Sequence, residues 1–409
     1  MRRAYLWLIA VAAIAPRLAV LLHERGRILT AFTDKSDDFA QTFVHHGTFG
    51  FIPGEPSAYT QPLYGFFLIP IYWIFGRTWW AVGGAQIIVA TATALLVYAI
   101  GARVMSRRAG MVAAVLATLN PYLVWHDVHL NREVLDQLVT AALILCTLIA
   151  AERRSLPWAT AVGVCGGLAL LGNVRLAFLP LVLAAYLLFR NGWSWAPVAV
   201  VAAAAVTVAP WVIRNRVEVG CFALTTDARA LWKANNEQTY RLLASGKWID
   251  DVKDPPHHPF PNPEEARDYY RATGKKLHVT ECANQNYYQH KTWVFVRDHP
   301  GEKAKLAGQA VRMEWDPRTT ASATDSGHGV IRNWAQPLYM SFLYALGLLG
   351  VAVAPRRFVG LALAMLAYQT LAAMVFVGAT RYRVATDFLI ALLAVGALEW
   401  ALTRRRNVR

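Results

Sequence analysis

Charged residues are scarce in this chain of 409 residues. Only 16% of the residues are Asp, Glu, Lys or Arg, and 56% are hydrophobic, whereas a soluble domain has about 25% charged residues. The apolar residues gather in blocks of roughly 15–24, the length that crosses a hydrocarbon core about 30 Å thick. Only a helix bundle satisfies the backbone in lipid with such blocks. The sequence therefore predicts an all-α polytopic membrane protein rather than a soluble fold.

Familiar nucleotide and hydrolase motifs are also missing. No Walker loop, GxSxG, HExxH or GxGxxG stands in a convincing context, which argues against nucleotide-driven or hydrolytic chemistry. The net charge of +15 would suit a nucleic-acid partner, but the Arg residues lie between apolar blocks. There they are better interpreted as topology signals and anion binders. We therefore expect contact with membrane lipids and none with nucleic acid.

A cleavage site is absent after the first apolar block, residues 6–22. This block resembles a signal peptide, but no A-x-A-like sequence follows it and Arg17 interrupts it, so we expect a retained first helix. No internal repeat, which a transporter often shows, is evident. Ten membrane spans are expected, at about residues 4–23, 80–102, 109–126, 133–151, 157–173, 176–189, 194–213, 336–353, 358–378 and 384–402.

Basic residues between these spans alternate in a way that assigns a topology. They cluster at residues 2–3, 103–108, 153–154, 190, 356–357 and 404–406, all on one side of the expected bundle. The positive-inside rule makes that side cytoplasmic. The loops at 24–79 and 214–335 then lie on the opposite side.

The segment Pro62–Phe75 decides on which side of the membrane the later loops lie. It is apolar but contains Pro70, and its 14 residues reach only about 21 Å as a helix. We expect an interfacial helix on the outer leaflet. The alternative is a short tilted span, which would place residues 103–108 and 152–154 outside.

Three regions follow from this pattern. They are an N-terminal transmembrane module at 1–213 that contains a first external loop at 24–79, an extracytoplasmic loop domain at 214–335, and C-terminal transmembrane helices at 336–409. The loop domain has an irregular, Pro-rich middle, and residues 284–310 have a helical composition. Only four Cys are present, of which Cys221 and Cys282 fall in this loop. A disulfide would survive there, and two free thiols are the alternative.

An acidic cluster opens the first external loop. Asp34, Asp37 and Asp38 follow the first span directly. One interpretation is a helix that Ser36 caps and whose first turn holds the later carboxylates. The other is a general base, because a carboxylate at a membrane mouth is partly desolvated and so becomes more basic.

A second polar cluster lies in the short external joint at 126–133. His126, Asp127 and His129 are candidate metal ligands, although their spacing matches no standard site. The alternative is an ordinary polar hairpin. Glu133 begins the next span, where ionisable groups are usually functional.

Cations at the external ends of spans form a third set, which the positive-inside rule does not explain. Guanidinium groups bind phosphate through bidentate, charge-assisted bonds, and the alternative is that they are interfacial anchors. The set comprises Arg175, Arg214, Arg216, Arg381 and Arg383.

Taken together, these features resemble the GT-C glycosyltransferases, and most closely the bacterial relatives of protein O-mannosyltransferases and lipid A aminoarabinose transferases. The resemblance runs through most of the membrane part and does not cover residues 225–330. The matching features are Arg17, the acidic loop at 34–38, HGTF at 46–49, QPLY at 61–64, IFG at 74–76, Asn120-Pro121, Glu133, PWVIRN at 210–215 and RYR at 381–383.

This resemblance implies a site and a reaction. An acid in the first external loop would act as base, and Asp34 lies nearest the expected distance before Gly47. Some relatives carry a phosphate-binding Lys where this chain has Gln61. The arginines Arg175, Arg381 and Arg383 are therefore the better candidates for binding the phosphate. The substrate-binding residues that the resemblance implies are Gln61, Tyr64, Glu133, Arg175, Arg214, Arg381, Tyr382 and Arg383.

The expected activity is transfer of a sugar from a polyprenyl-phosphate donor to an acceptor hydroxyl of a glycan, lipid or protein, with inversion at the anomeric carbon. The expected location is the inner (plasma) membrane of a bacterium, with the active site on the extracytoplasmic face. No cofactor is certain, and a divalent metal is a candidate. The alternatives are a lipid-linked glycan ligase or phosphotransferase, and a lipid or sugar flippase or transporter.

Overall fold

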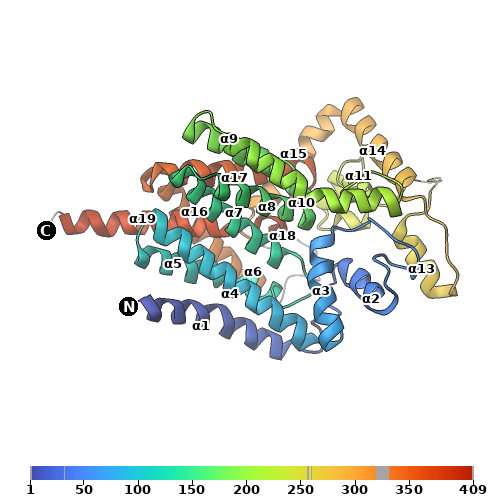
Figure 1. Cartoon of the computed structure of the whole chain (residues 1–409), viewed down its shortest axis with the longest axis horizontal. Helices are drawn as coiled ribbons and strands as arrows, with labels where there is room; N and C mark the ends of the chain where they lie inside the picture. The colour runs from blue at the N-terminus through green and yellow to red at the C-terminus, as the bar shows by residue number, and fades with distance from the viewer. Residues whose placement is uncertain (1, 32, 256–257, 259, 319–330, 408–409) are drawn as a thin grey trace.

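The computed structural model describes residues 2–31, 33–255, 258, 260–318 and 331–407 (Figure 1). Over these residues the fold is helical, and the only β-type pairings are two isolated bridges, Thr33 with Leu130 and Ile52 with Glu55. The expected spans are helices or begin with one. They are α1 (Arg2–His23), α4 (Trp79–Val104), α5 (Arg107–Thr118), α7 (Glu133–Arg153), α8 (Leu156–Gly172), α9 (Leu179–Asn191), α10 (Ala196–Glu218), α16 (Gln336–Val353), α17 (Arg356–Val375) and α19 (Asp387–Asn407).

Seven helical segments of the described chain are long and apolar enough to cross a bilayer: Arg3–His23, Trp79–Val104, Glu133–Arg153, Val174–Asn191, Ala196–Glu218, Asn333–Val353 and Arg356–Val375. Helix α8, with 17 residues, is slightly shorter. These apolar helices pack around a core of Ala, Val, Leu and Ile side chains. The expected all-α membrane fold is confirmed.

The span expected at 109–126 is not one continuous helix. Helix α5 ends at Thr118, and a separate short helix, α6 (Pro121–His126), follows it. A residue before proline avoids the helical region, and the Asn120 side chain caps α6 by accepting a hydrogen bond from the Tyr122 N–H. This break turns the chain toward the polar joint that precedes α7.

The two chain ends lie at one end of the bundle, and the helices of the long loops lie at the other (Figure 1). Helix α3 (Pro62–Phe75) runs across that far end of the bundle rather than along its axis (Figure 1). This is the arrangement expected of an interfacial helix. The first external loop also contains α2 (Ser36–His46), which packs against α3.

Ser36 does not cap α2 as the sequence suggested. Ser36 is the first residue of that helix, and the side chain of Lys35, the residue before it, makes no capping hydrogen bond. The capping side chain is that of Asp34. The Asp34 Oδ1 atom accepts hydrogen bonds from the Ser36 backbone N–H and hydroxyl, at 2.9 and 2.7 Å. The Asp34 carboxylate therefore satisfies free donors at the start of the helix.

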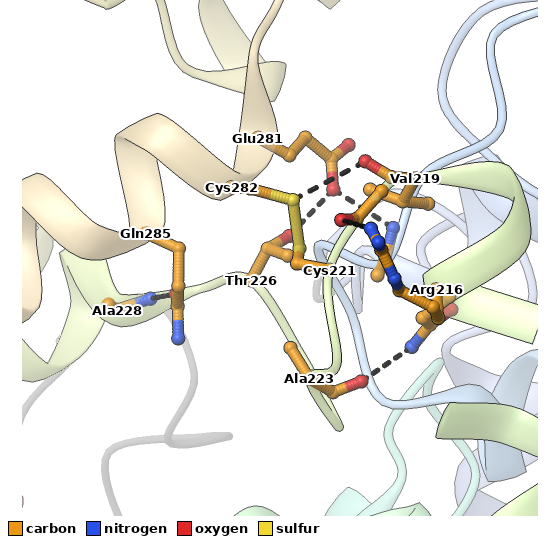
Figure 2. The surroundings of a disulfide bond; sticks show 12 residues. Arg216, Val219, Cys221, Ala223, Thr226, Ala228, Glu281, Cys282 and Gln285 are labelled. Carbon is orange, nitrogen blue, oxygen red and sulfur yellow. Dashed lines mark hydrogen bonds between the residues drawn. A yellow bond between two sulfur atoms is a disulfide. The ribbon is translucent and has the colours of Figure 1, made fainter. Parts of the chain in front are cut away.

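The second long loop folds into helices and closes with a disulfide. Its elements are α11 (Ala228–Lys233), α12 (Thr239–Ala244), η2 (Ile249–Asp251), α13 (Pro263–Thr273), α14 (Glu281–Asp298) and α15 (Pro300–Trp315). Cys221 and Cys282 form the disulfide, which joins the segment after α10 to the start of α14 (Figure 2). Beside it, the Glu281 carboxylate accepts hydrogen bonds from the Thr226 hydroxyl and the Ala58 N–H. The loop domain is thus fastened to the first external loop.

Helix α15 presses against the turn that leads into α18 (Thr380–Arg383). Gly378 makes this possible, because a Cβ atom at that position would lie 1.8 Å from the Ala310 carbonyl oxygen. The Glu314 carboxylate of α15 also accepts hydrogen bonds from the Ala379 N–H and the Gln369 side chain, both at 2.9 Å. The external domain therefore sets the position of Arg381 and Tyr382.

Candidate functional site

A cavity of about 690 Å³ opens at the loop end of the bundle. Its walls come from the first external loop, the joint before α7, η1 (Val174–Leu176), the external domain and α18. The polar side chains that line it include Asp34, Lys35, Gln61, Arg132, Asn173, Arg175, Asp227, Lys247, Arg381 and Tyr382. Segments from nearly the whole chain thus meet around one charged hollow.

Asp34 is the only one of the three candidate carboxylates that lines this cavity. Its Oδ1 atom is held by Ser36, and its backbone N–H donates to the Leu130 carbonyl at 3.1 Å. The carboxylate is therefore fixed in direction and remains partly exposed. A fixed, accessible carboxylate can accept a proton from a group bound in the cavity.

Lys35 ties this loop to the external domain. Its Nζ atom lies 3.0 Å from the Asp227 carboxylate and 3.3 Å from that of Glu264. Burial lowers the pKa of Lys35, but Asp227, Tyr59 and Glu264 outweigh burial and hold that pKa well above its ordinary value. The ammonium group therefore stays charged and fixes the neighbouring Asp34 backbone.

Arg175 is held without an acidic partner. Its guanidinium carbon lies 3.3 Å from the ring centroid of Tyr382, and Nη1 donates to the Val377 carbonyl at 2.7 Å. No described carboxylate forms an ion pair with it. The Asn173 side chain accepts a hydrogen bond from the Arg175 N–H and donates one to Asp136. Arg175 is therefore a positioned cation whose remaining donors can bind an anion.

Two further guanidinium groups line the same cavity. Arg381 is paired with the buried carboxylate of Glu133 at 2.8 Å. Arg132 donates to the Gln61 side chain, and its buried Nε has no hydrogen-bond partner. Glu133 does not line the cavity but orients Arg381. The structure thus joins Gln61, Arg175, Arg381 and Tyr382 of the sequence candidates with Asp34.

Asp37 and Asp38 have other surroundings. Asp37 is buried, accepts a hydrogen bond from the Tyr72 hydroxyl at 2.6 Å and pairs with Arg77 at 2.8 Å. Asp38 pairs with Arg271 of α13 at 2.8 Å. The first contact fastens α2 to α3 and the segment after it, and the second fastens α2 to the external domain.

Four other sequence candidates also lie away from the cavity. Tyr64 is buried and donates to Gln86 at 2.6 Å. Arg214 pairs with Glu218 and donates to the Ser57 carbonyl, and Arg216 donates to the Gly220 carbonyl. Arg383 is fully buried, pairs with Asp387 at 2.9 Å and donates to the Glu314 and Asp316 carbonyls.

The three candidate metal ligands are directed to different partners. Asp127 pairs with the buried Arg17 at 2.7 Å, and the His129 ring bonds the Trp125 carbonyl. The His126 ring bonds the Asn131 side chain. In the described parts of the chain, no three His, Cys, Asp or Glu side chains gather into a group that could hold a metal ion.

Sequence reasoning gave no role to Lys35, Arg132, Asp227 or Lys247. Arg132 directly precedes Glu133, so its position at the external end of a span was a usable signal. Asp227 and Lys247 lie in the external loop. Nothing in their local sequence indicates that this loop folds back over Asp34.

Comparison with known proteins supports the fold. Residues 56–213, less than half of the chain, match the sequence model of the dolichyl-phosphate-mannose-protein mannosyltransferase family. No curated protein matches the chain by sequence. Among solved structures, the archaeal oligosaccharyltransferase AglB from Archaeoglobus fulgidus, in complex with an inhibitory peptide and a dolichol-phosphate, has a TM-score of 0.58 at 13% identity. That match covers 98% of this chain and 51% of AglB.

A second structure of the Archaeoglobus fulgidus oligosaccharyltransferase, in complex with Zn and sulfate, has a TM-score of 0.55 at 15% identity, and the match covers 98% of this chain and 49% of that one. ArnT from Cupriavidus metallidurans bound to undecaprenyl phosphate has a TM-score of 0.46 at 15% identity, with 97% of this chain and 78% of that chain covered. The chain spans about half the length of the oligosaccharyltransferase. It has a GT-C-like membrane fold, as its sequence predicted.

Proposed function

We propose that this protein transfers a sugar from a polyprenyl-phosphate donor to an acceptor hydroxyl, at the extracytoplasmic face of a bacterial inner membrane. The observation that carries the proposal is the meeting of Asp34 with Arg132, Arg175 and Arg381 in one cavity. A carboxylate can take up a proton, and guanidinium groups can hold a phosphate. Both tasks are needed when a glycosyl phosphate reacts with an alcohol.

The reaction begins with the acceptor hydroxyl beside Asp34. The carboxylate accepts the hydroxyl proton while the oxygen forms a bond to the anomeric carbon of the donor sugar. The bond from that carbon to the phosphate oxygen breaks, and its electron pair leaves with the lipid phosphate. Attack from the face opposite to the leaving group inverts the anomeric centre. General base catalysis of this kind typically contributes about 10²–10⁴-fold.

The departing phosphate gains negative charge, which the arginines would stabilise. Arg175 suits this role best, because it has no carboxylate partner among the described residues and Tyr382 holds its guanidinium plane. Preorganised cations in a site shielded from water stabilise developing charge strongly. Arg381 is partly neutralised by Glu133, so we assign it a supporting role in binding the donor phosphate.

One matching family and one similar structure support a lipid-phosphate donor. The description of the family whose model matches residues 56–213 names dolichyl-phosphate-mannose. The AglB structure holds a dolichol-phosphate and a peptide. We extend only the lipid-phosphate chemistry to this chain, and we take residues 1–213 and 336–409 as its membrane modules and 214–335 as its external domain.

The test measures sugar transfer from a radiolabelled polyprenyl-phosphate sugar by the purified protein. It compares two nearly isosteric substitutions with the wild type. Asp34→Asn keeps an oxygen that can accept the Ser36 hydrogen bonds, but it removes the base. We expect it to lower turnover by at least about 10²-fold. Asp38→Asn is the matched control, since Asp38 lies outside the cavity. Equal activity of Asp34→Asn and wild type would refute the proposal.

A further inference from the structure

A second hollow lies beside the proposed catalytic cavity. This cleft, of about 540 Å³, lies between α12 and α15 in the external domain. The turn at Gly246 and Lys247 lines both the cleft and the main cavity. A molecule bound in the cleft would therefore lie next to the space in which Asp34 stands.

One face of α15 lines this cleft. Residues spaced three or four apart lie on the same side of a helix, and the cleft-lining residues on α15 follow that spacing. They are Lys305, Gly308, Gln309, Arg312 and Met313, and Asp316 follows directly after the helix. The other face of α15 is buried and includes Leu306, Ala307, Ala310 and Glu314. The cleft face is therefore a polar surface with a fixed backbone behind it.

The charge of the cleft is mainly positive. Lys247, Lys305 and Arg312 are exposed, and none of them forms an ion pair with a described residue. The carboxylate in the cleft belongs to Asp316, which is already paired with Arg318 at 3.2 Å. Cations gathered around a concave surface raise the local concentration of anions.

The cleft also offers contacts that suit a sugar chain. Tyr240 lines the cleft and is 45% exposed. The Gln309 side chain donates to the Tyr240 carbonyl at 3.2 Å, whereas its Oε1 atom is buried without a partner. At Gly308 a side chain would meet no atom within 4 Å, so the floor of the cleft is open.

We propose that this cleft binds an anionic glycan, which is the part of the acceptor that lies away from the reacting hydroxyl. The identification of this glycan as the acceptor rests on the proposed function, but its binding can be tested without catalysis. Phosphate and carboxylate groups share the chemistry that Lys247, Lys305 and Arg312 would recognise. The glycan would reach past the Gly246–Lys247 turn to present its hydroxyl to Asp34.

Calorimetric titration of the full chain in detergent tests this with three probes: tetragalacturonate, maltotetraose that carries one phosphate, and neutral maltotetraose. At least one anionic probe should bind about tenfold or more tightly than the neutral one. The tighter of the two identifies whether carboxylate or phosphate is the preferred group. Equal binding of all three probes would overturn the proposal.

Matched variants locate the binding. Charge reversal at Lys305→Glu with Arg312→Glu should weaken binding of the anionic probe about tenfold. The control reverses Arg241 and Lys291 to Glu, two exposed cations outside the cleft. It changes net charge by the same amount and should alter affinity less than about twofold. An equal loss in both double variants would mean non-specific attraction and would overturn the cleft assignment.

Two glycine substitutions on α15 and the Asp34→Asn variant complete the test. Gly308→Leu should fill the cleft and weaken binding, whereas Gly301→Leu, at another open position of α15, should not. The Asp34→Asn variant should bind the anionic probe as wild type does. If Asp34→Asn keeps transfer activity, the proposed function fails and the cleft result stands. If the cleft variants bind normally, the cleft fails and the function stands.

Discussion

Two buried arginines at the external end of the bundle differ in what surrounds them. Arg383 is neutralised by Asp387 and bonded to two backbone carbonyls, so it joins α15 to α18 and α19. Arg175 lines the cavity, is stacked on Tyr382 and has no described acidic partner. Their sequence contexts are alike, since each lies at the external end of a span. Only the placement of Asp387 and Tyr382 separates a structural cation from a candidate phosphate ligand.

Arg175→Lys should therefore damage catalysis more than stability. Lysine keeps the charge but loses the planar group that stacks on Tyr382 and bonds phosphate through two atoms. We expect turnover to fall about tenfold or more, with a smaller change in the donor KM if the contact strengthens as phosphate leaves. Steady-state kinetics with varied donor concentration measures both. Arg383→Lys, the control, should mainly lower the unfolding temperature. Unchanged kinetics in Arg175→Lys would remove Arg175 from the phosphate site.

Asp37 should prove important for stability. Its carboxylate is buried and holds both the Tyr72 hydroxyl and Arg77. Asp37→Ala leaves the Tyr72 hydroxyl and the half-buried Arg77 without their shared acceptor, and hydrogen bonds to charged groups are worth about 1.5–3 kcal/mol. Asp38→Ala breaks a more exposed pair and should cost at most about 1 kcal/mol. Thermal unfolding in detergent compares the two, and an equal loss in both would contradict the structural role given to Asp37.

The family resemblance ranked Asp34 slightly ahead by its distance from Gly47, but the residues themselves could not separate Asp34 from Asp37 and Asp38. The reason is that Tyr72, Arg77 and Arg271, which engage the other two, lie 35 residues or more away in the chain. Long-range partners decide which carboxylate stays available. For Arg383 the long-range partners are the Glu314 and Asp316 carbonyls, which lie more than 60 residues away in the chain. Its ion-pair partner Asp387 is only four residues away but falls inside the expected last span.

At the scale of elements, helix α15 connects the external domain to α18. Burial raises the pKa of Glu314 to about 7, although Gln369, Arg175, the Ala379 N–H and Arg383 all pull the pKa down. The ordinary value is 4.5. The unfolded chain thus loses this proton at lower pH than the folded chain, so rising pH favours unfolding.

Stability should accordingly fall as the pH rises from about 4.5 to about 7, by on the order of 3 kcal/mol from Glu314 alone. Above pH 7 this loss is complete. Glu314→Gln should flatten that part of the profile of unfolding temperature against pH. Glu302→Gln, at an exposed position of the same helix, should leave the profile unchanged. Identical profiles for wild type and Glu314→Gln would show that Glu314 does not control this region.

Element positions could be predicted well where apolar length alone decides them. The spans at 80–102 and 133–151 match α4 and α7 within a few residues. The break before Pro121 was missed because the flanking residues are apolar enough to continue a span. The external helices α11 and α12, of six residues each, leave no periodic pattern to detect. Arg229 of α11 pairs with Asp254 and Glu264. Leu243 of α12 packs with Ile249 and Val377, so both helices are placed by residues outside them.

At the scale of the whole molecule, the arrangement of helices predicts a topology. The chain ends and the external domain lie at opposite ends of the bundle (Figure 1). Single cysteines at Lys275 and Arg356, introduced in a chain whose Cys146 and Cys165 are replaced by Ser, should react from opposite sides in cells. A membrane-impermeant maleimide should label Lys275→Cys in intact cells and Arg356→Cys only after lysis. Labelling of both in intact cells would contradict the topology.

The lining of the main cavity begins at Thr30 and ends at Tyr382. Membrane proteins are inserted as they are synthesised, from the N-terminus onward. Asp34 therefore reaches its final side of the membrane long before Arg381 and Tyr382 leave the ribosome. Until α18 docks against α15, Arg175 has no Tyr382 ring to stack on, and the proposed base Asp34 has no complete phosphate site near it. On the proposed function, a chain that still lacks α18 would be inert toward the lipid donors around it.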